Sequence, residues 1–365
     1  MKLLKNSITI RGDSLYCPLS LSLDSYGNCL TDCWHCYFRN LNHIWDQEIK
    51  PADIDLLEKK LSNGIKNKTP NSFLSHCLKN KKTIRWGNKS DPFQEVENKY
   101  KIAIEIFNLL IRLNWSFVIQ TRFMHNLKKY EKYIFRAFDK NLITIMPVIS
   151  PGGEKDWEIL ERKRTTSIAE RLKYSNFLIR KGIPLGVNGE PFIPGYHTIY
   201  DFENILKLLK DHCISSYNTY SFHFNAFVAK RLHKIGIDIE KIWYYNQDKE
   251  WKKILEKLID LSKKYNIKLG CPDFVNSGKN YIEPSNTCCG INVPNPITFN
   301  THYFKKYKQK GFSTEKIIQL TDDNSGDMEL AKKIIDGEKC DFYTLEDAGF
   351  EKINTIKCKK LGLCL

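Results

Sequence analysis

Short apolar segments typical of buried strands alternate with amphipathic helical segments along most of this chain. The strand segments end at Gly, Pro, Ser or Asp, and the helical segments carry apolar residues three and four positions apart. The six predicted strands are Leu15–Leu23, Thr83–Trp86, Ser116–Gln120, Ile143–Ile149, Leu185–Phe192 and Tyr217–Phe224. The predicted helices are Pro51–Leu61, Glu97–Leu113, Leu127–Phe138, Ser167–Arg180, Asp201–His212 and Trp251–Lys264, and a last strand is expected at Ile267–Cys271.

This alternation predicts an α/β fold with a parallel sheet and crossover helices. Periodicity alone leaves open whether the helices cover one face of a curved sheet, as in a full or partial barrel, or both faces of a doubly wound sheet. In either case, ligand-binding groups belong at the carboxyl ends of the strands. From about residue 275 the chain becomes loop-rich and cysteine-rich, so we expect a domain at 1–275 and a C-terminal extension at 276–365.

Composition excludes several classes of protein. Hydrophobic residues make up 42% of the 365 residues, which is too apolar for a disordered chain. No apolar run approaches the roughly 20 residues of a membrane-spanning helix, and the first residues lack the apolar core of a secretion signal. A cytoplasmic protein is therefore expected. Its twelve cysteines then indicate metal ligation or redox chemistry more than a disulfide framework, although several could be ordinary buried thiols.

The net charge of +15 is concentrated in two stretches without acidic residues. Lys59 to Ser90 contains nine cations, from Lys59 to Lys89, and no Asp or Glu. Pro284 to Thr314 contains four lysines among aromatic residues. Cations interleaved with rings favour contacts with phosphates and stacked bases, so a nucleic-acid partner is expected. The alternative is a lysine-rich solvated surface without a specific partner.

Three cysteines with short spacings follow the first predicted strand, in Cys29-Leu-Thr-Asp-Cys33-Trp-His-Cys36. Three thiolates at spacings of four and three can bind one face of a cubic iron–sulfur cluster and leave its fourth iron open. Zinc is the alternative, because two of the thiols form a Cys-x-x-Cys pair and His35 lies between them. A redox-active disulfide pair is a third reading of the same residues.

The triplet, placed on the loop after the first strand of a βα alternation, resembles the radical S-adenosylmethionine (radical SAM) superfamily. The resemblance implies a partial six-stranded (β/α) barrel in which Cys29, Cys33 and Cys36 bind a [4Fe-4S] cluster. It also implies that SAM binds the open iron and is cleaved to a 5′-deoxyadenosyl radical, with electrons from a flavodoxin or ferredoxin. The superfamily usually has an aromatic residue just before the third cysteine, where this chain has His35.

Other motifs between residues 15 and 225 are similar to the branch that contains spore photoproduct lyase and the DNA repair photolyase-like proteins. They are Cys36-Tyr37, the segment from Trp86 to Glu97, Ile119–Arg122, Ser150, the segment from Glu161 to Leu172, and the segments that begin at Gly182 and Pro191. By this resemblance, the SAM-binding residues are Tyr37, Gly87, Asn88, Ser90, Asp91, Arg122, Ser150, Asn188 and Glu190.

Three of these assignments have a chemical rationale. The stretch from Gly87 to Asp91 would receive the methionine amino group. Arg122 stands where the lyase has a lysine for the methionine carboxylate, which a guanidinium can bind through two hydrogen bonds. The alternative for Arg122 is a surface ion pair with Asp139 or Glu131. Asn188 and Glu190 would face ribose hydroxyls, unless the strand register is shifted by one residue so that they face the helices.

The remaining cysteines separate this chain from the lyase. The lyase has a hydrogen-donor cysteine in or beside its equivalent of Gly87–Ser90, and this chain has none there. Cys77 and Cys271 are the candidate donors, and splitting of thymine dimers by the route of the lyase is not expected. In the extension, Cys271, Cys288, Cys289 and Cys340 could bind a second iron–sulfur cluster. Zinc and free structural thiols are the alternatives.

The sequence therefore predicts a radical SAM enzyme that abstracts hydrogen from a base or lesion in nucleic acid. The first alternative is a radical SAM enzyme that modifies a peptide, protein or small metabolite. The second is a zinc-stabilised nucleic-acid-binding module without catalysis.

Overall fold

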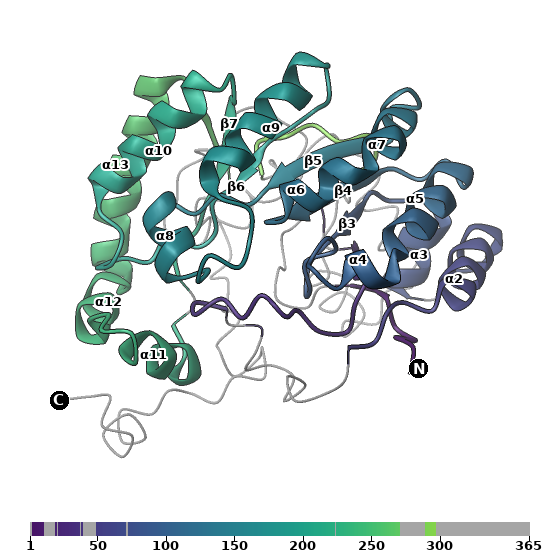
Figure 1. Ribbon diagram of the computed structural model, residues 1–365, viewed down its shortest axis with the longest axis horizontal. Coiled ribbons are helices and arrows are strands. Elements are labelled where there is room, and N and C mark those ends of the chain that lie inside the picture. The colour runs from purple at the N-terminus through teal and green to yellow at the C-terminus, as the bar shows by residue number, and fades with distance from the viewer. Residues whose placement is uncertain are drawn as a thin grey trace.

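We describe a computed structural model of the chain (Figure 1). It describes residues 2–10, 19, 21–36, 38, 49–70, 72–222, 224–270 and 289–296.

Eight short strands form two hydrogen-bonded sheets. The first sheet has the order β1 (Ile8–Ile10), β2 (Leu21–Leu23), β3 (Ile84–Trp86), β4 (Phe117–Thr121) and β5 (Ile143–Pro147). The second has the order β6 (Val187–Asn188), β7 (Ser216–Asn218) and β8 (Lys268–Gly270). All pairs are parallel except β1 with β2. Isolated parallel bridges from Ile145 to Leu185 and from Val148 to Asn188 connect β5 to β6, so the parallel strands follow one another in chain order.

The parallel strands have one face covered by helices and a second face that carries both polar and apolar side chains. Side chains alternate across a strand, and the face with Ile84, Trp86, Phe117, Ile119, Ile143 and Ile145 lies in the main hydrophobic cluster with residues of α2, α5 and α7. Arg85 pairs with Val118 in the sheet register, and both lie on the opposite face. That second face therefore carries a buried charge close to apolar neighbours, and the candidate site lies on it.

The helices lie outside the strands. Figure 1 shows α2, α5, α7, α9, α10 and α13 following one another in an arc around them. The helices are α2 (Ile54–Lys66), α3 (Phe73–Lys79), α4 (Glu97–Tyr100), α5 (Ile102–Arg112), α6 (Met124–Leu127), the 3-10 helix η1 (Lys128–Tyr130), α7 (Glu131–Phe138), α8 (Glu154–Ile159), α9 (Ile168–Arg180), α10 (Ile199–Asp211), α11 (Ala226–His233), α12 (Ile239–Tyr245) and α13 (Asp248–Tyr265).

The helix ends follow local chemistry. Ser167 caps α9, where its hydroxyl accepts a hydrogen bond from the Glu170 backbone N–H at 3.3 Å, as the Ser-x-x-Glu spacing predicts. The long helix predicted from Glu97 to Leu113 is wrong in one respect. It is divided into α4 and α5 at Lys101, whose φ of 54° is left-handed and interrupts a helix.

Part of the predicted C-terminal extension packs against the sheet. Residues 289–296 run past the amino ends of the strands, where the Thr83 N–H donates to the Asn295 carbonyl at 2.8 Å and the Ser216 hydroxyl donates to the Cys289 carbonyl at 3.1 Å. Ile291 and Val293 share a buried cluster with Val118 of β4. This segment therefore belongs to the core of the α/β domain, and the division at residue 276 remains a prediction.

The mixed α/β fold with a parallel sheet is confirmed. Each predicted strand overlaps an observed strand. The strand β4 is as long as predicted but shifted by one residue, β7 begins one residue earlier than predicted, and the others are shorter than predicted. The six-stranded partial barrel remains a prediction. None of the helices in the described part is long and apolar enough to cross a membrane.

Candidate functional site

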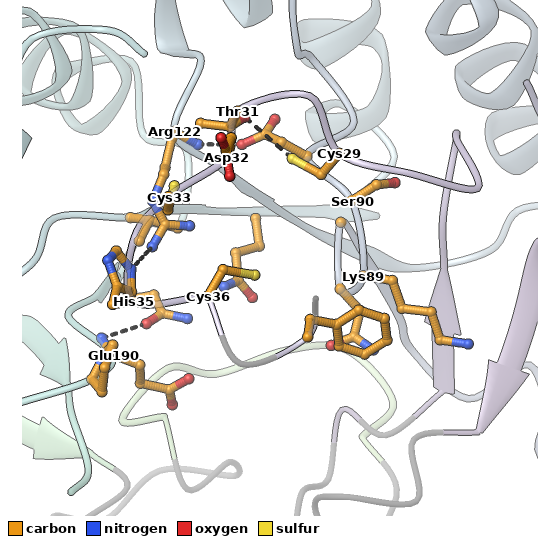
Figure 2. Close-up of a pocket in the computed structure, with 18 of the residues that line it drawn as sticks. Cys29, Thr31, Asp32, Cys33, His35, Cys36, Lys89, Ser90, Arg122 and Glu190 are labelled. Atoms are coloured by element: carbon orange, nitrogen blue, oxygen red, sulfur yellow. Dashed lines mark hydrogen bonds between the residues drawn. The ribbon is translucent and has the colours of Figure 1, made fainter. Parts of the chain in front are cut away.

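A cavity of about 140 Å³ lies at the carboxyl ends of the parallel strands. Its wall includes Cys29, Cys33 and Cys36 from the loop after β2, and Figure 2 shows the three side chains arranged around it. Side chains that follow β3, β4 and β6 complete the wall. The cysteine loop and the ends of these three strands thus converge at one place, as expected for ligand groups in a parallel α/β fold.

The environment of the thiols is buried and includes cations. Burial raises the pKa of the Cys29 and Cys33 thiols, and the guanidinium of Arg122 partly opposes this for Cys33. The positive charge of Arg231 also lies close enough to interact with Cys33 and Cys36. Within the described residues, no three side chains of His, Cys, Asp or Glu gather closely enough to surround a single metal ion. The three thiols are therefore spread around the cavity instead of meeting at a point.

Asp32 fixes the conformation of the cysteine loop. Its backbone is left-handed, with a φ of 56°. Its two carboxylate oxygens accept hydrogen bonds from Arg231 of α11 and from Arg162 after α8, both at 2.7 Å. Arg164 lies 3.8 Å from the same carboxylate. Three cations from distant parts of the sequence thus hold the residue that precedes Cys33.

Trp34 connects the same loop to the opposite wall. Its ring lies between two guanidinium groups, with the Arg162 carbon 5.2 Å and the Arg231 carbon 5.1 Å from the ring centre. Cation–π contacts of this kind contribute about 0.5–1 kcal/mol each. The Trp34 N–H also donates to the Leu160 carbonyl at 2.8 Å. The loop between Cys33 and Cys36 is therefore anchored by both side-chain and backbone contacts.

Asp24, directly after β2, holds the loop that follows β3. One carboxylate oxygen accepts three consecutive backbone N–H groups, from Asn88 at 3.2 Å, Lys89 at 2.7 Å and Ser90 at 3.1 Å. Burial raises the pKa of Asp24, and these three hydrogen bonds oppose the rise. The Ser90 hydroxyl donates to the Tyr26 carbonyl at 2.7 Å. The predicted amino-group loop is thus held rigidly against the first parallel strand.

Asp91 ties this loop to the end of β4. Its carboxylate accepts hydrogen bonds from the Thr121 hydroxyl at 2.6 Å, the Arg122 N–H at 2.7 Å and the Phe93 N–H at 3.0 Å. Burial raises the pKa of Asp91, while these hydrogen bonds lower it. Gly87, Asn88, Ser90 and Asp91 all line the cavity, and their contact with SAM remains a prediction. Asp91 shapes its wall through contacts within the protein.

Arg122 is held by a buried ionic network. Its Nε donates to Glu161 Oε1 at 3.0 Å, and the other oxygen of Glu161 is paired with Arg171 and with the Thr165 hydroxyl. Burial raises the pKa of Glu161, but Arg171 and Arg122 outweigh it and lower the pKa to about 2. The partner of Arg122 is therefore Glu161, and the surface pair with Asp139 or Glu131 does not form.

His35 lies beside this network. Its Nε2 is 3.4 Å from Arg122 Nη2, while its buried Nδ1 has no partner within the described part of the chain. Burial and the positive charge of Arg122 lower the pKa of His35 to about 3. A neutral imidazole that accepts at Nε2 carries its proton on Nδ1. His35 thus leaves one buried N–H without an acceptor.

Asn188 and Glu190 face the cavity and not the helices. The Asn188 Oδ1 accepts the Glu190 N–H at 2.8 Å, and a Glu190 oxygen accepts from Asn218 Nδ2 at 2.8 Å. The buried Nδ2 of Asn188 has no partner among the described residues. The strand register assumed for these two side chains therefore agrees with the structure.

Other candidate residues lie elsewhere. Ser150 is buried, with its hydroxyl unpaired in the described part of the chain, and it is not among the residues that line the cavity. Cys77 lies in the main hydrophobic cluster under α3, and Cys289 lies in the small cluster with Val118. Neither thiol lines the cavity. Tyr37, Cys271, Cys288 and Cys340 lie outside the described residues.

The basic stretch from Lys59 to Lys89 is divided by the fold. Two of its cations, Arg85 and Lys89, line the cavity. The others belong to α2, α3 and the segments that follow them, on the outer side of the sheet. The structure does not gather the stretch into one track along the cavity, and its contact with phosphates remains a prediction.

Several residues that build the site were not identified from the sequence. Asp24, Asp32, Arg85, Arg171 and Arg231 contact the loops and strands of the site across separations of up to 199 positions. No local spacing marks such contacts. For Arg85, its position inside an apolar strand was a usable signal, because a cation there needs a reason to be buried.

No protein-family model matches the chain, and no curated protein matches it. Among solved structures, it is similar to SuiB of Streptococcus suis bound to S-adenosylmethionine, with 11% identity and a TM-score of 0.40 over 63% of this chain and 48% of that one. It is also similar to the cobalamin-dependent S-adenosylmethionine radical enzyme OxsB with aqua-cobalamin and S-adenosylmethionine bound, with 13% identity and a TM-score of 0.36 over 61% of this chain and 30% of that one. The chain thus spans less than half of either protein, and likenesses this weak carry no conclusion about its activity.

Proposed function

We propose that the chain is a radical SAM enzyme in which Cys29, Cys33 and Cys36 bind a [4Fe-4S] cluster. The observation that carries this proposal is the convergence of three thiols from one loop with polar groups from several strand ends, around one cavity. When bound, the cluster would supply the electron that cleaves SAM to methionine and a 5′-deoxyadenosyl radical.

The donor set fits such a cluster. A tetrahedral zinc ion with Zn–S bonds of about 2.3 Å needs sulfurs only about 4 Å apart, together with a fourth ligand. Within the described residues, the three thiols do not gather with a further His, Cys, Asp or Glu around one metal ion, whereas a cluster of four irons is a larger group that three thiolates can bind. Arg122 and Arg231 place positive charge near the thiols, which favours their ionised, metal-binding form.

The remaining wall offers groups that match SAM. With the N–H groups of residues 88–90 bound to Asp24, the loop can offer carbonyl oxygens, which accept hydrogen bonds from an ammonium group. Arg122 would bind the methionine carboxylate while Glu161 holds its Nε. The unpaired Nδ2 of Asn188 and the carboxylate of Glu190 would bind the ribose hydroxyls.

The substrate class is open to a direct test. A nucleic-acid substrate is supported by Lys89 in the cavity wall and by the exposed side chains of Lys59, Lys66 and Lys68 in the same stretch. If it is correct, binding of DNA or RNA weakens steeply as salt increases. Absent or salt-independent binding to both excludes it and leaves a peptide, protein or small metabolite.

The main test is anaerobic reconstitution with iron and sulfide, followed by reduction in the presence of SAM. We expect about four irons per chain from the triplet, together with formation of 5′-deoxyadenosine. Alanine variants of Cys29, Cys33 and Cys36 should lose both, whereas Cys213→Ala changes an exposed thiol and should lose neither. A fully loaded protein that does not cleave SAM contradicts the proposal, and a colourless, air-stable zinc protein establishes the zinc-stabilised alternative.

A further inference from the structure

Arg85 is a cation with little exposed surface, and no carboxylate of the site pairs with it. It lies in the middle of β3, only 7% of its surface is exposed, and it lines the cavity. Its hydrogen bond is from Nε to Gln120 Oε1 of β4, at 2.5 Å. Within the described residues, no carboxylate forms an ion pair with it. Both terminal nitrogens of its guanidinium therefore remain available for a ligand.

The acids in the cavity wall have other partners. Asp32 is paired with Arg162 and Arg231, and Asp91 accepts three hydrogen bonds from β4 and its own loop. Glu190 accepts from Asn218. Because a guanidinium in a confined site is stabilised by a counter-ion, an arginine that faces the cavity without a carboxylate partner among the described residues points to an anionic ligand there.

The free edge of Arg85 matches an anion with two oxygens in one plane. With Nε bound to Gln120, the two terminal nitrogens form a fork that fits a carboxylate through two parallel hydrogen bonds. The carboxylates of Asp32, Asp91 and Glu190 also line this wall. They repel the two negative charges of a phosphate monoester more strongly than the single charge of a carboxylate.

We propose that Arg85 binds a carboxylate group of the substrate, a proposal that rests on the enzymatic function proposed above. Lys89, which lines the same cavity, adds positive charge. The substrate is thus an acid of low molecular weight, or the carboxyl-bearing part of a peptide, and Arg85 holds this group on the inner face of the sheet.

The test compares wild type with Arg85→Gln, Arg85→Lys and the control Arg112→Gln. Arg112 is a surface residue, with 57% of its side chain exposed, paired with Glu58 on the helical side of the sheet. Binding of propionate, propionamide and ethyl phosphate to the reconstituted full chain is measured by equilibrium dialysis, with and without SAM. The dissociation constant of SAM is measured for the same four proteins, and circular dichroism checks their folding.

We expect wild type and Arg112→Gln to bind propionate more tightly than propionamide or ethyl phosphate. Arg85→Gln should weaken propionate binding at least about tenfold, the effect of losing a charged hydrogen-bond pair, without changing the affinity for SAM. Arg85→Lys keeps the charge but loses the fork, so its affinity for propionate should be intermediate. If Arg85→Gln does not fold, the lysine variant carries the test.

Four outcomes overturn the proposal. They are an absence of saturable propionate binding to wild type, unchanged propionate binding in the Arg85 variants, a preference for ethyl phosphate, and loss of SAM affinity in Arg85→Gln. The last would mean that Arg85 binds the carboxylate of SAM itself. Failure of the enzymatic proposal is distinguishable, because wild type would then not bind SAM while propionate binding can still be measured without it.

Discussion

The buried carboxylate of Glu161 gives a quantitative prediction for stability. Burial alone would raise its pKa, but Arg171 and Arg122 lower it from 4.5 to about 2. Because one pKa unit corresponds to about 1.4 kcal/mol, ionised Glu161 stabilises the folded chain at neutral pH by roughly 3 kcal/mol. Glu161→Gln removes this charge and leaves two buried guanidinium groups without their partner. We expect it to reduce the free energy of unfolding by about 3–5 kcal/mol.

The sign of the pH dependence follows from the direction of the shift. The pKa of Glu161 is lower in the folded chain than in the unfolded chain, so its contribution is complete above pH 4.5 and is lost as the pH falls towards about 2. Wild type should therefore lose stability over this window more steeply than Glu161→Gln. Taking the difference between the two proteins removes the contributions of other acids, such as Asp24 and Asp91, whose pKa values are raised.

The assay is urea unfolding followed by circular dichroism at several pH values. The control is Glu158→Gln, because Glu158 is half-exposed and pairs with Lys163 at the surface. Such surface pairs contribute about 0–1 kcal/mol, so this variant should unfold close to wild type. Two results would refute the argument from the buried network. One is that Glu161→Gln lowers the free energy of unfolding by no more than Glu158→Gln does. The other is that Glu161→Gln loses stability below pH 4.5 as steeply as wild type.

Three further substitutions test the loops of the site. Gly87→Ala should lower the free energy of unfolding by more than about 2 kcal/mol, because the new Cβ would lie 2.3 Å from the Gln120 carbonyl oxygen. The control is Gly236→Ala, which is also at positive φ but has no atom within 4 Å of the new Cβ. Measured by thermal unfolding, the control should lose less stability. Asp24→Ala leaves three N–H groups without their acceptor and should weaken SAM binding, measured by dialysis, by about tenfold or more; unchanged affinity would contradict this role. Asp32→Ala removes the partner of two arginines and should lower the iron content after reconstitution; loading equal to wild type would show that the loop forms without it.

The sequence predicts the sheet well, because each strand is identified by its own composition. Ile143–Pro147 is completely buried, and so is Phe117–Thr121 apart from Gln120. Short segments without a repeating apolar pattern were harder to predict. The helix at Phe73–Lys79 was not predicted because only seven residues form it, which is too short to show a repeating apolar pattern. The strand Ile8–Ile10 was missed as well, since three residues carry no alternation to detect.

The candidate site was predictable where its residues follow strands directly. Parallel strands bring their carboxyl ends together, so residues at or just after these ends could be placed in the site from the sequence. These are the cysteine loop, the loop after β3, Arg122, Asn188 and Glu190. The partners that hold them were not predictable. Glu161 is 39 positions from Arg122 along the chain, and Arg231 is 199 positions from Asp32. Which acid meets which base across such separations depends on how the segment after α8 and helix α11 pack, and a single sequence does not record this.

The polar groups in the cavity wall and directly behind it divide into two sets with different roles. Asp32 and Asp91 in the wall, and Asp24 and Glu161 behind it, have partners within the protein, so they determine the shape of the wall before any ligand arrives. Within the wall, the buried atoms His35 Nδ1 and Asn188 Nδ2 lack such partners in the described part of the chain. The hydrogen bond of Arg85 uses Nε and leaves its terminal nitrogens facing the cavity. Leaving buried donors unpaired costs about 1–3 kcal/mol each, and a preorganised site recovers this cost when a ligand accepts their hydrogen bonds. All three unpaired groups are donors on the cavity wall, so its ligands must present acceptors, as the ribose and adenine of SAM and a substrate carboxylate do.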